Sequence, residues 1–439
     1  MRFGTDGLRG PAPGTLSAAV AASLGHAVAT TFDATRVFVG RDTRESGPLL
    51  VAGVARGCAA AGALVADLGV APTPAVAFAA EHGGAPGIVV SASHNPWYDN
   101  GLKVFAPGGR KLTGAQQDTI ESALRTAAPA ATGSGAMVAT RDAGDAVERW
   151  AAHVGASIEG RSLEGLSVVV DTGHGAAYAV AGPVLTGLGA TVAVINAAPD
   201  GRNINDACGS TDLGPLAAAV RAAGADLGLA FDGDADRVLA VDHRGHPVDG
   251  DAIIAICALD RHRRGCPRSD GVVVTVMANL GFRRAMADNG IEVVETPVGD
   301  RHVLEALART GLVLGGEQSG HVVFSDYATT GDGLLTGVQL LDVLARARRP
   351  LAEVVDVSLT RFPQVLVSVP VDGDAADAVA RIAADIAAAE ADLGAEGRVL
   401  VRPSGTEPVV RVMAEADTDG RARAAVQRLV DALTPEESS

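Results

Sequence analysis

The sequence lacks paired cysteines, long apolar runs and an N-terminal hydrophobic segment. Its four cysteines have no Cys-x-x-Cys spacing, which argues against a zinc site or a disulfide framework, so we expect free thiols in a reducing compartment. No stretch approaches the roughly 20 uninterrupted apolar residues of a membrane span, and no secretory signal is apparent. These absences predict a cytoplasmic protein. The cysteines are Cys58, Cys208, Cys257 and Cys266.

Positive charge is also scarce. Lysine and arginine number 36 against 52 aspartates and glutamates, which gives a net charge of −16 at pH 7. Nucleic acid and anionic membranes are therefore not expected as partners. Lys103 and Lys111 are the only lysines. Because Lys103 follows a serine-rich loop in a chain that otherwise uses arginine, we consider it a candidate functional residue.

The chain does contain many aliphatic residues, arranged as alternating strands and helices. With 439 residues and 47% hydrophobic side chains, it is long enough for several folded domains. Strand and helix patterns alternate in three stretches of similar size, which predicts parallel sheets covered by helices on both faces and hints at an internal repeat. We expect strands at 36–40, 63–68, 87–93, 166–171, 191–196, 271–276 and 291–296, with helices at 47–62, 72–82, 175–188 and 280–289.

The last part of the chain has a different pattern, typical of a small α+β domain. Residues 127–137, rich in Ala, Gly, Thr and Pro, are predicted to form a loop. We therefore predict three similar α/β domains at 1–147, 148–245 and 246–359, followed by a smaller α+β domain at 360–439. The last domain is expected to contain strands at 365–371, 398–402 and 409–414, and helices at 373–393 and 419–434.

A serine loop, Ser-Ala-Ser-His-Asn-Pro at 91–96, follows the aliphatic run 87–90. A loop at the carboxyl end of a buried strand is where open α/β sheets bind ligands. Ser93 is the candidate nucleophile, and His94 and Asn95 offer donors for a phosphate. A lone serine after a strand is more often an ordinary solvated residue, so the loop needs a companion motif.

That companion is an acidic triplet, Asp232, Asp234 and Asp236, which follows the apolar strand 227–231. Three carboxylates at a spacing of two repel one another unless a hard cation such as Mg²⁺ neutralises them. A calcium EF-hand is excluded, because its sixth position would be Arg237 instead of Gly and its twelfth His243 instead of Glu. A solvated acidic turn remains the alternative. Together, the serine and the triplet suggest phosphoryl transfer.

Three further motifs fit the binding of a phosphorylated sugar. Glu317 and Ser319 lie in the Gly-rich turn 315–321, although an ordinary turn is the alternative. The segment 402–408 and a nearby arginine resemble a phosphate nest, with a hairpin turn as the alternative. Arg9 lies in the Gly-rich loop 3–10 and is a candidate anion ligand. The nest residues are Arg402, Ser404, Gly405, Thr406 and Arg411.

Taken together, the motifs resemble the α-D-phosphohexomutase superfamily and, within it, the bacterial phosphoglucosamine mutases. The resemblance spans nearly the whole chain and implies four domains around a central cleft. It also implies that Ser93 carries the transferred phosphoryl group and, with the aspartate triplet, binds one Mg²⁺ per chain. Glu317 and Ser319 would hold sugar hydroxyls, and the nest the distal phosphate. The motifs are 3–10, 40–44, 91–103, 232–237, 316–321 and 402–408.

The implied reaction interconverts glucosamine 6-phosphate and glucosamine 1-phosphate. The phosphoserine would form a 1,6-bisphosphate, which turns end for end before returning a phosphoryl group to Ser93. The general base and acid are expected among Lys103, His94 and His321. A phosphoglucomutase/phosphomannomutase is the alternative enzyme; a non-catalytic sugar-phosphate sensor is a weaker alternative, because nucleophile and triplet are both present. A homodimer is left open.

Overall fold

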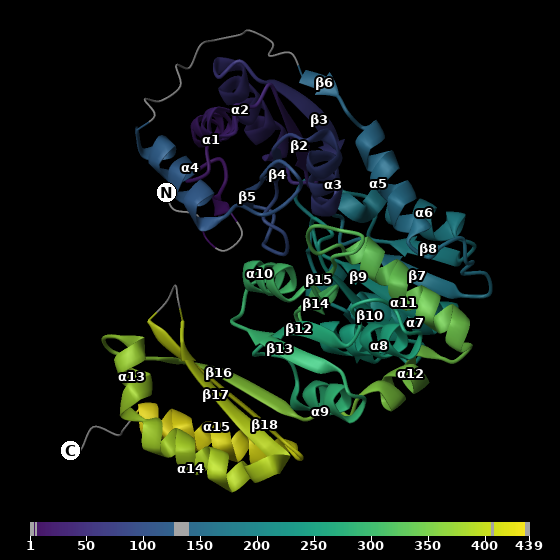
Figure 1. The fold of residues 1–439 in the computed structure, drawn as a ribbon, viewed down its shortest axis with the longest axis vertical. Coiled ribbons are helices and arrows are strands. Elements are labelled where there is room, and N and C mark those ends of the chain that lie inside the picture. Colours follow the sequence, from purple (N-terminus) through teal and green to yellow (C-terminus); the bar gives the residue numbers. More distant parts are fainter. Residues whose placement is uncertain (1–3, 5–6, 127–139, 405–407, 435–439) are drawn as a thin grey trace. The chain divides into compact units, whose positions relative to one another are not determined.

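A computed structural model describes residues 4, 7–126, 140–404 and 408–434 (Figure 1). The loop predicted at 127–137 lies outside these residues. The chain divides into two compact units. Unit 1 contains Met1–Met277 and Gly290–Ser358, and unit 2 contains Ala278–Asn289 and Leu359–Ser439.

The first sheet of unit 1 has six strands in the spatial order β1-β5-β4-β2-β3-β6. Helices α1 and α2 pack closely because glycines line their contact: a Cβ added at Gly57 would lie 1.8 Å from the Ala22 carbonyl oxygen. The elements are β1 (Leu8–Pro11), α1 (Ala18–Thr31), β2 (Arg36–Arg41), α2 (Gly47–Ala60), β3 (Leu64–Val70), α3 (Thr73–Gly83), β4 (Gly87–Val90), β5 (Asp99–Phe105), α4 (Gly114–Thr126), β6 (Thr140–Asp142) and α5 (Asp145–Ala156).

The second sheet has the order β11-β10-β9-β7-β8. The single helix predicted at 175–188 is wrong: a short 3₁₀ helix is followed by a separate α-helix. Pro183 explains the break, because proline is tolerated only in the first turn of a helix, so the helix starts again just before it. The elements are β7 (Ser167–Asp171), η1 (Ala176–Ala179), α6 (Ala181–Gly187), β8 (Thr191–Ile195), η2 (Gly209–Thr211), α7 (Gly214–Ala223), β9 (Leu227–Phe231), β10 (Val238–Asp242) and β11 (Pro247–Val248).

The third sheet has the order β13-β12-β14-β15. Its central strand β12 is fully buried and consists of Gly, Val and Thr, residues typical of a strand covered on both faces. The elements in unit 1 are α8 (Gly250–Arg263), β12 (Gly271–Thr275), β13 (Glu292–Thr296), α10 (Asp300–Thr310), β14 (Leu314–Gly316), β15 (Val322–Phe324), α11 (Gly333–Ala347) and α12 (Leu351–Ser358).

The three sheets share one four-stranded pattern, which confirms the similarity of the three α/β units. In the successive sheets the pattern is β5-β4-β2-β3, β10-β9-β7-β8 and β15-β14-β12-β13. In each, the first pair is antiparallel and the other two pairs are parallel. The prediction of wholly parallel sheets is therefore wrong at this edge, where a short hairpin-like connection replaces a crossover helix.

Unit 2 is built on a three-stranded antiparallel sheet in the order β16-β18-β17. The long helix predicted at 373–393 is divided at Ile382, whose backbone leaves helical geometry (φ −97°, ψ 18°) while its side chain is buried in the core of this unit. The elements are α9 (Leu280–Asp288), β16 (Gln364–Pro370), α13 (Ala375–Arg381), α14 (Ala383–Leu393), η3 (Gly394–Glu396), β17 (Gly397–Pro403), β18 (Val409–Ala416) and α15 (Asp419–Leu433).

Helix α9 is held in unit 2 by the buried carboxylate of Glu415 on β18. This carboxylate accepts hydrogen bonds from Asn279 Nδ2 at 3.1 Å and from the Leu280 amide at 3.0 Å. Arg398 on β17 forms an ion pair with it. A buried charge needs such partners, so these contacts fix the start of α9 to the terminal sheet.

The four cysteines are free thiols, as predicted. In the part of the chain that the structure describes, no helix is long and apolar enough to cross a membrane.

Candidate active site

The same connection in each of the three repeated sheets carries one of the motifs found in the sequence. The β4–β5 connection contains the serine loop, the β9–β10 connection contains the acidic triplet, and the β14–β15 connection contains the Glu317 loop. All three lie in unit 1. Each follows the carboxyl end of a strand that pairs in parallel with its neighbour, which is the usual ligand-binding edge of such sheets.

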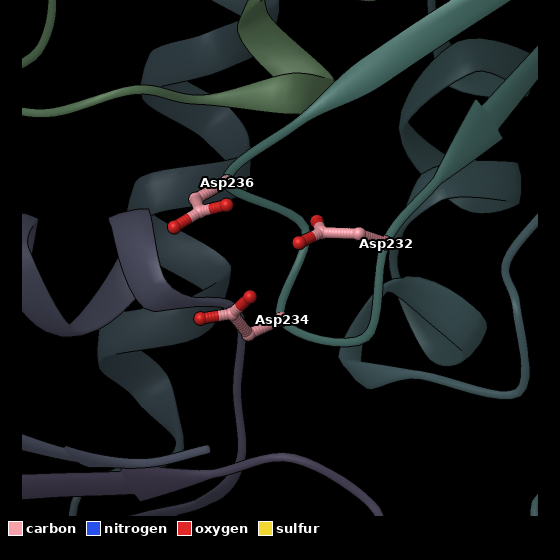
Figure 2. Close-up of side chains that lie close together, drawn as sticks. All are labelled: Asp232, Asp234 and Asp236. Carbon is pink, nitrogen blue, oxygen red and sulfur yellow. The ribbon is translucent and has the colours of Figure 1, made fainter. Parts of the chain in front are cut away.

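The carboxylates of Asp232, Asp234 and Asp236 converge on one point (Figure 2), and their candidate ligand atoms lie within 4.8 Å of one another. The loop curls tightly because Ala235 adopts a left-handed backbone (φ 57°). All three residues are buried. Burial, followed by the charges of Asp236 and Asp234, raises the pKa of Asp232 well above its usual value.

These residues fit a hard divalent cation. The donor set consists of carboxylate oxygens, which Mg²⁺ prefers. Moreover, Oδ1 of Asp234 is buried and has no hydrogen-bond partner among the described residues. A cation at this point would relieve both the repulsion and the unpaired oxygen.

Ser93 is brought to the triplet although 139 positions separate it from Asp232. Its hydroxyl donates a hydrogen bond to Asp232 Oδ2 at 2.6 Å, and His94 Nδ1 lies 3.2 Å from the same Oγ. The backbone of Ser93 is left-handed (φ 53°), which is uncommon for a serine. Burial, then the nearby Arg237 and Arg9 guanidinium groups, lower the pKa of His94 to about 4.

Lys103 also joins the triplet, from strand β5. Its Nζ lies 2.8 Å from Asp234 Oδ2 and 2.9 Å from Asp236 Oδ2. Thr73, at the start of α3, donates a hydrogen bond to the same oxygen of Asp234 at 2.5 Å. The sequence interpretation found Lys103 through the rarity of lysine but missed Thr73, which no motif marks.

The Glu317 loop adjoins the triplet through the backbone, since the amide of Val238 donates to the Gly320 carbonyl at 3.1 Å. Glu317 Oε1 accepts a hydrogen bond from the Gly299 amide at 3.0 Å. His321 is buried, with Nε2 3.8 Å from Asp300 Oδ2. The hydroxyl of Ser319 and both ring nitrogens of His321 have no hydrogen-bond partner among the described residues, so they are available to a ligand.

Arg9 approaches the serine loop from strand β1, where its Nη1 donates to Asn95 Oδ1 at 3.4 Å. Arg9 therefore lies beside the serine loop, and its role as an anion ligand stays a prediction. Arg237, the last residue of the acidic motif, lies with Nε 3.8 Å from Asp236 Oδ1 and was not selected.

The residues predicted to form a phosphate nest are described in unit 2 only in part, because Gly405 and Thr406 lie outside the described residues. Arg402 and Arg411 face each other across β17 and β18. Burial, then the charge of Arg411, lowers the pKa of Arg402. Nε of Arg411 is buried without a hydrogen-bond partner among the described residues. Two adjacent guanidinium groups repel each other, so the binding of an anion between them is favoured.

Four family models match successive segments of the chain. They are described as phosphoglucomutase/phosphomannomutase alpha/beta/alpha domain I (residues 1–130), domain II (145–245) and domain III (249–362), and the phosphoglucomutase/phosphomannomutase C-terminal domain (366–432). With the repeated sheets and the serine opposite an acidic triplet, this succession makes the protein an α-D-phosphohexomutase, and the predicted fold class of three α/β domains and a smaller C-terminal domain is confirmed.

Curated relatives narrow the assignment. The chain is 52% identical to a phosphoglucosamine mutase of Frankia alni over 442 residues, which cover 97% of this chain and 96% of that protein. It is 50% identical to that of Kineococcus radiotolerans over 446 residues, 98% of each. The chain belongs to the phosphoglucosamine mutase family.

Solved structures agree with the fold. A phosphoglucomutase/phosphomannomutase family protein from Burkholderia thailandensis superposes with a TM-score of 0.81 at 29% identity, covering 98% of both chains. An N-acetylphosphoglucosamine mutase from Aspergillus fumigatus, in complex with GlcNAc-6P and magnesium, has a TM-score of 0.69 at 18% identity, covering 99% of this chain and 95% of that one. At that identity the likeness concerns the fold alone.

Proposed function

We propose that the protein interconverts glucosamine 6-phosphate and glucosamine 1-phosphate through a phosphoserine at Ser93 and a glucosamine 1,6-bisphosphate intermediate. One observation carries the proposal: the hydroxyl of Ser93 hydrogen-bonds to a buried acidic triplet from a separate sheet. The glucosamine part of the proposal is supported by relatives of about half-identical sequence that bear this name.

In the first transfer, the bond between Ser93 Oγ and phosphorus breaks and the free sugar hydroxyl forms a new bond to that phosphorus. The hydroxyl gives up its proton to a nearby base. The bisphosphate then reorients, its other phosphoryl group returns to Ser93 Oγ, and the sugar oxygen that is released takes up a proton. The activator and the intermediate are thus the same molecule.

The chain's own residues have distinct tasks in these steps. Asp232 fixes the direction of Ser93 Oγ, and Arg9 and Arg237 supply positive charge beside the serine loop. Glu317 and Ser319 hold sugar hydroxyls. One Mg²⁺ per chain, held by Asp232, Asp234, Asp236 and a phosphoserine oxygen, would supply charge stabilisation for the transferring phosphoryl group.

Three side chains are candidates for the proton transfers: Lys103, His94 and His321. Nδ1 of His94 lies 3.2 Å from Ser93 Oγ, within reach of a proton at the reacting centre. Lys103 is bound to two carboxylates of the triplet, and the ring nitrogens of His321 form no hydrogen bond with any residue that the structure describes. All three stay in the proposal.

The distal phosphate is assigned to unit 2. Arg402, Ser404, Gly405, Thr406 and Arg411 would hold whichever phosphate is not reacting. The adjacent guanidinium groups of Arg402 and Arg411 support this role. Three further predictions stand beside this proposal. Limited proteolysis tests the four-domain division at 147, 245 and 359. Cell fractionation tests the cytoplasmic location, and sedimentation tests the homodimer.

Three other functions are compatible with this scaffold. A phosphoglucomutase/phosphomannomutase would prefer glucose or mannose phosphates, so a substrate panel that includes glucosamine 6-phosphate decides between them. A non-catalytic sensor would bind sugar phosphate without turnover, and a phosphatase would release free phosphate.

Ser93→Ala tests the central claim. We expect mutase activity with glucosamine 6-phosphate and catalytic bisphosphate to fall by several orders of magnitude, because the group that carries the phosphoryl is gone. The wild-type protein should gain the mass of one phosphoryl group on incubation with the bisphosphate, and the variant should not. Ser162→Ala, at an exposed serine, is the control. Turnover by Ser93→Ala close to that of the wild type would overturn the phosphoserine mechanism.

A further inference from the structure

Behind the serine loop lies a buried carboxylate, Asp42, in the motif at 40–44 to which no role has yet been given. Asp42 follows β2 and is fully buried. Its Oδ2 accepts a hydrogen bond from Ser91 Oγ at 2.6 Å and another from Arg44 Nε at 2.8 Å. Its Oδ1 accepts one from the Arg44 amide at 2.9 Å. The carboxylate therefore orients two side chains at once.

The first of these, Arg44, grips the backbone of the serine loop. Its guanidinium is fully buried and donates to the carbonyl oxygens of Ser93 at 2.9 Å and Asn95 at 2.8 Å, and to that of Pro96. A planar guanidinium presents its donors in a fixed fork, so three successive contacts define one conformation of the loop. Asp42 compensates the buried positive charge.

The second side chain, Ser91, binds the backbone amide of Ser93. Its Oγ accepts a hydrogen bond from the Ser93 amide at 2.9 Å while donating to Asp42. The amide and the carbonyl of Ser93 are therefore both fixed, one through Ser91 and one through Arg44. A left-handed backbone at a non-glycine residue costs on the order of 1 kcal/mol and persists only where its surroundings over-determine it.

A third contact comes from the loop between β8 and η2. Asn205 Nδ2 donates to the Ser93 carbonyl at 2.9 Å and to that of Asn95 at 3.2 Å, the same two oxygens that Arg44 binds. The approach is close, since a Cβ added at Gly233 would lie 2.5 Å from the Ser93 carbonyl oxygen. The loop is thus held from two directions, while the Ser93 side chain directs its buried Oγ to Asp232.

We propose that Asp42, Arg44 and Ser91, assisted by Asn205, are positioning residues that hold Ser93 in its left-handed conformation and so aim Oγ at the acidic triplet. This inference rests on the proposed phosphoryl transfer through Ser93. A displacement of about 1 Å at a reacting atom can lower the reaction rate about 100-fold. Loss of these contacts should therefore lower the rate of the chemical step more than the affinity for substrate.

The decisive variant is Ser91→Ala, which removes one hydroxyl. We expect kcat to fall about 10- to 100-fold with KM unchanged, and the single-turnover rate of Ser93 phosphorylation by the bisphosphate, followed by intact mass, to fall equally. Ser157→Ala is the matched control, because the Ser157 hydroxyl is buried and also both donates, to Val154, and accepts, from Gln339. The two variants should lose similar melting temperature, and only Ser91→Ala should lose kcat.

Asn205→Gly is a second test of the proposal, and its result does not depend on whether Ser91→Ala folds normally. Asn205 is half-buried, and glycine suits its left-handed backbone (φ 58°). We expect a smaller fall in kcat, again with KM unchanged. Retention of wild-type kcat by either Ser91→Ala or Asn205→Gly overturns the proposal, as does a fall in kcat in Ser157→Ala equal to that in Ser91→Ala. Absence of mutase activity and of a phosphoryl adduct in the wild type would instead overturn the proposed function.

Discussion

At the scale of single residues, Asp332 shows how burial of a carboxylate affects stability. It caps α11, accepts hydrogen bonds from the Leu335 amide at 2.9 Å and from Trp150 Nε1 at 2.8 Å, and is buried. Burial nevertheless prevails and raises the pKa of Asp332 to about 6. The folded protein therefore keeps a proton between pH 4 and pH 6 that the unfolded chain has released.

The folded state binds more protons than the unfolded chain in that window. The contribution of Asp332 to the free energy of unfolding is therefore fully present below about pH 4 and is lost as the pH rises through 6. We expect Asp332→Asn to remove this part of the pH dependence, a difference of up to about 3 kcal/mol in the free energy of unfolding between the two ends of the window. Urea unfolding of both proteins from pH 4 to pH 7 measures it. Asp288→Asn, at an exposed position on α9, should keep the wild-type slope; parallel curves for Asp332→Asn would contradict the assignment.

Much of the site can be identified from single residues in the sequence, and the rest depends on distant contacts. Ser93 and the aspartate triplet stand out because their hydroxyl and carboxylate groups follow aliphatic strands, and Lys103 stands out because the chain has only two lysines. Asp42 and Arg44 stand in a recognisable motif, but their function depends on carbonyl groups about 50 positions away. No local pattern reveals such a partner.

At the scale of secondary-structure elements, the contact between α1 and α2 is set by glycine. A Cβ at Gly57 would lie 1.8 Å from the Ala22 carbonyl oxygen, which belongs to helix backbone and cannot rotate away. We expect Gly57→Ala to lower the free energy of unfolding by about 2–4 kcal/mol through separation of the helices, with KM unchanged. Gly187→Ala on α6, where a Cβ meets nothing within 4 Å, is the control and should be neutral or slightly stabilising. Equal melting temperatures for the two variants would contradict this packing.

The hairpin of β17 and β18 gives a second prediction at this scale. Arg411→Ala should raise KM for glucosamine 6-phosphate and also lower kcat, because a loosely held distal phosphate seldom aligns the sugar at Ser93. Escape of the bisphosphate into solution should increase. Arg381→Ala, at an exposed arginine on α13, should change neither constant. Unchanged kinetics in Arg411→Ala would place the distal phosphate elsewhere.

The predicted elements succeeded where hydrophobic patterning decides the outcome and failed where a particular residue overrides it. Strands such as β2 and β7 have buried, mostly apolar centres, and their observed bounds lie within a residue or two of the predicted ones. The breaks before Pro183 and at Ile382, by contrast, divide helices whose composition is otherwise favourable. One edge pair of strands in each sheet is antiparallel because the connection between the two strands is too short for a crossover helix. The general alternation of strand and helix patterns in the sequence does not show this exception.

At the scale of the whole molecule, metal binding should appear as added stability. If Asp232, Asp234 and Asp236 hold Mg²⁺ only in the folded state, Mg²⁺ at about 100 times its dissociation constant should stabilise the protein by about 2.7 kcal/mol and raise its melting temperature. EDTA should abolish activity reversibly. In Asp232→Asn, the rise with Mg²⁺ should disappear, while the metal-free protein becomes more stable by on the order of 1 kcal/mol because a buried like charge is removed. A wild-type melting temperature indifferent to Mg²⁺ would contradict the site.

The grouping of residues 278–289 with the terminal sheet has a consequence for dividing the gene. Between the two compact units the polypeptide crosses three times, after Met277, after Asn289 and after Ser358. A gene fragment that starts at codon 359 would encode β18 without Asn279 and Leu280, and the Glu415 carboxylate would lose two of its hydrogen-bond donors. Such a fragment would gain these donors only by recruiting helix α9 from a second polypeptide.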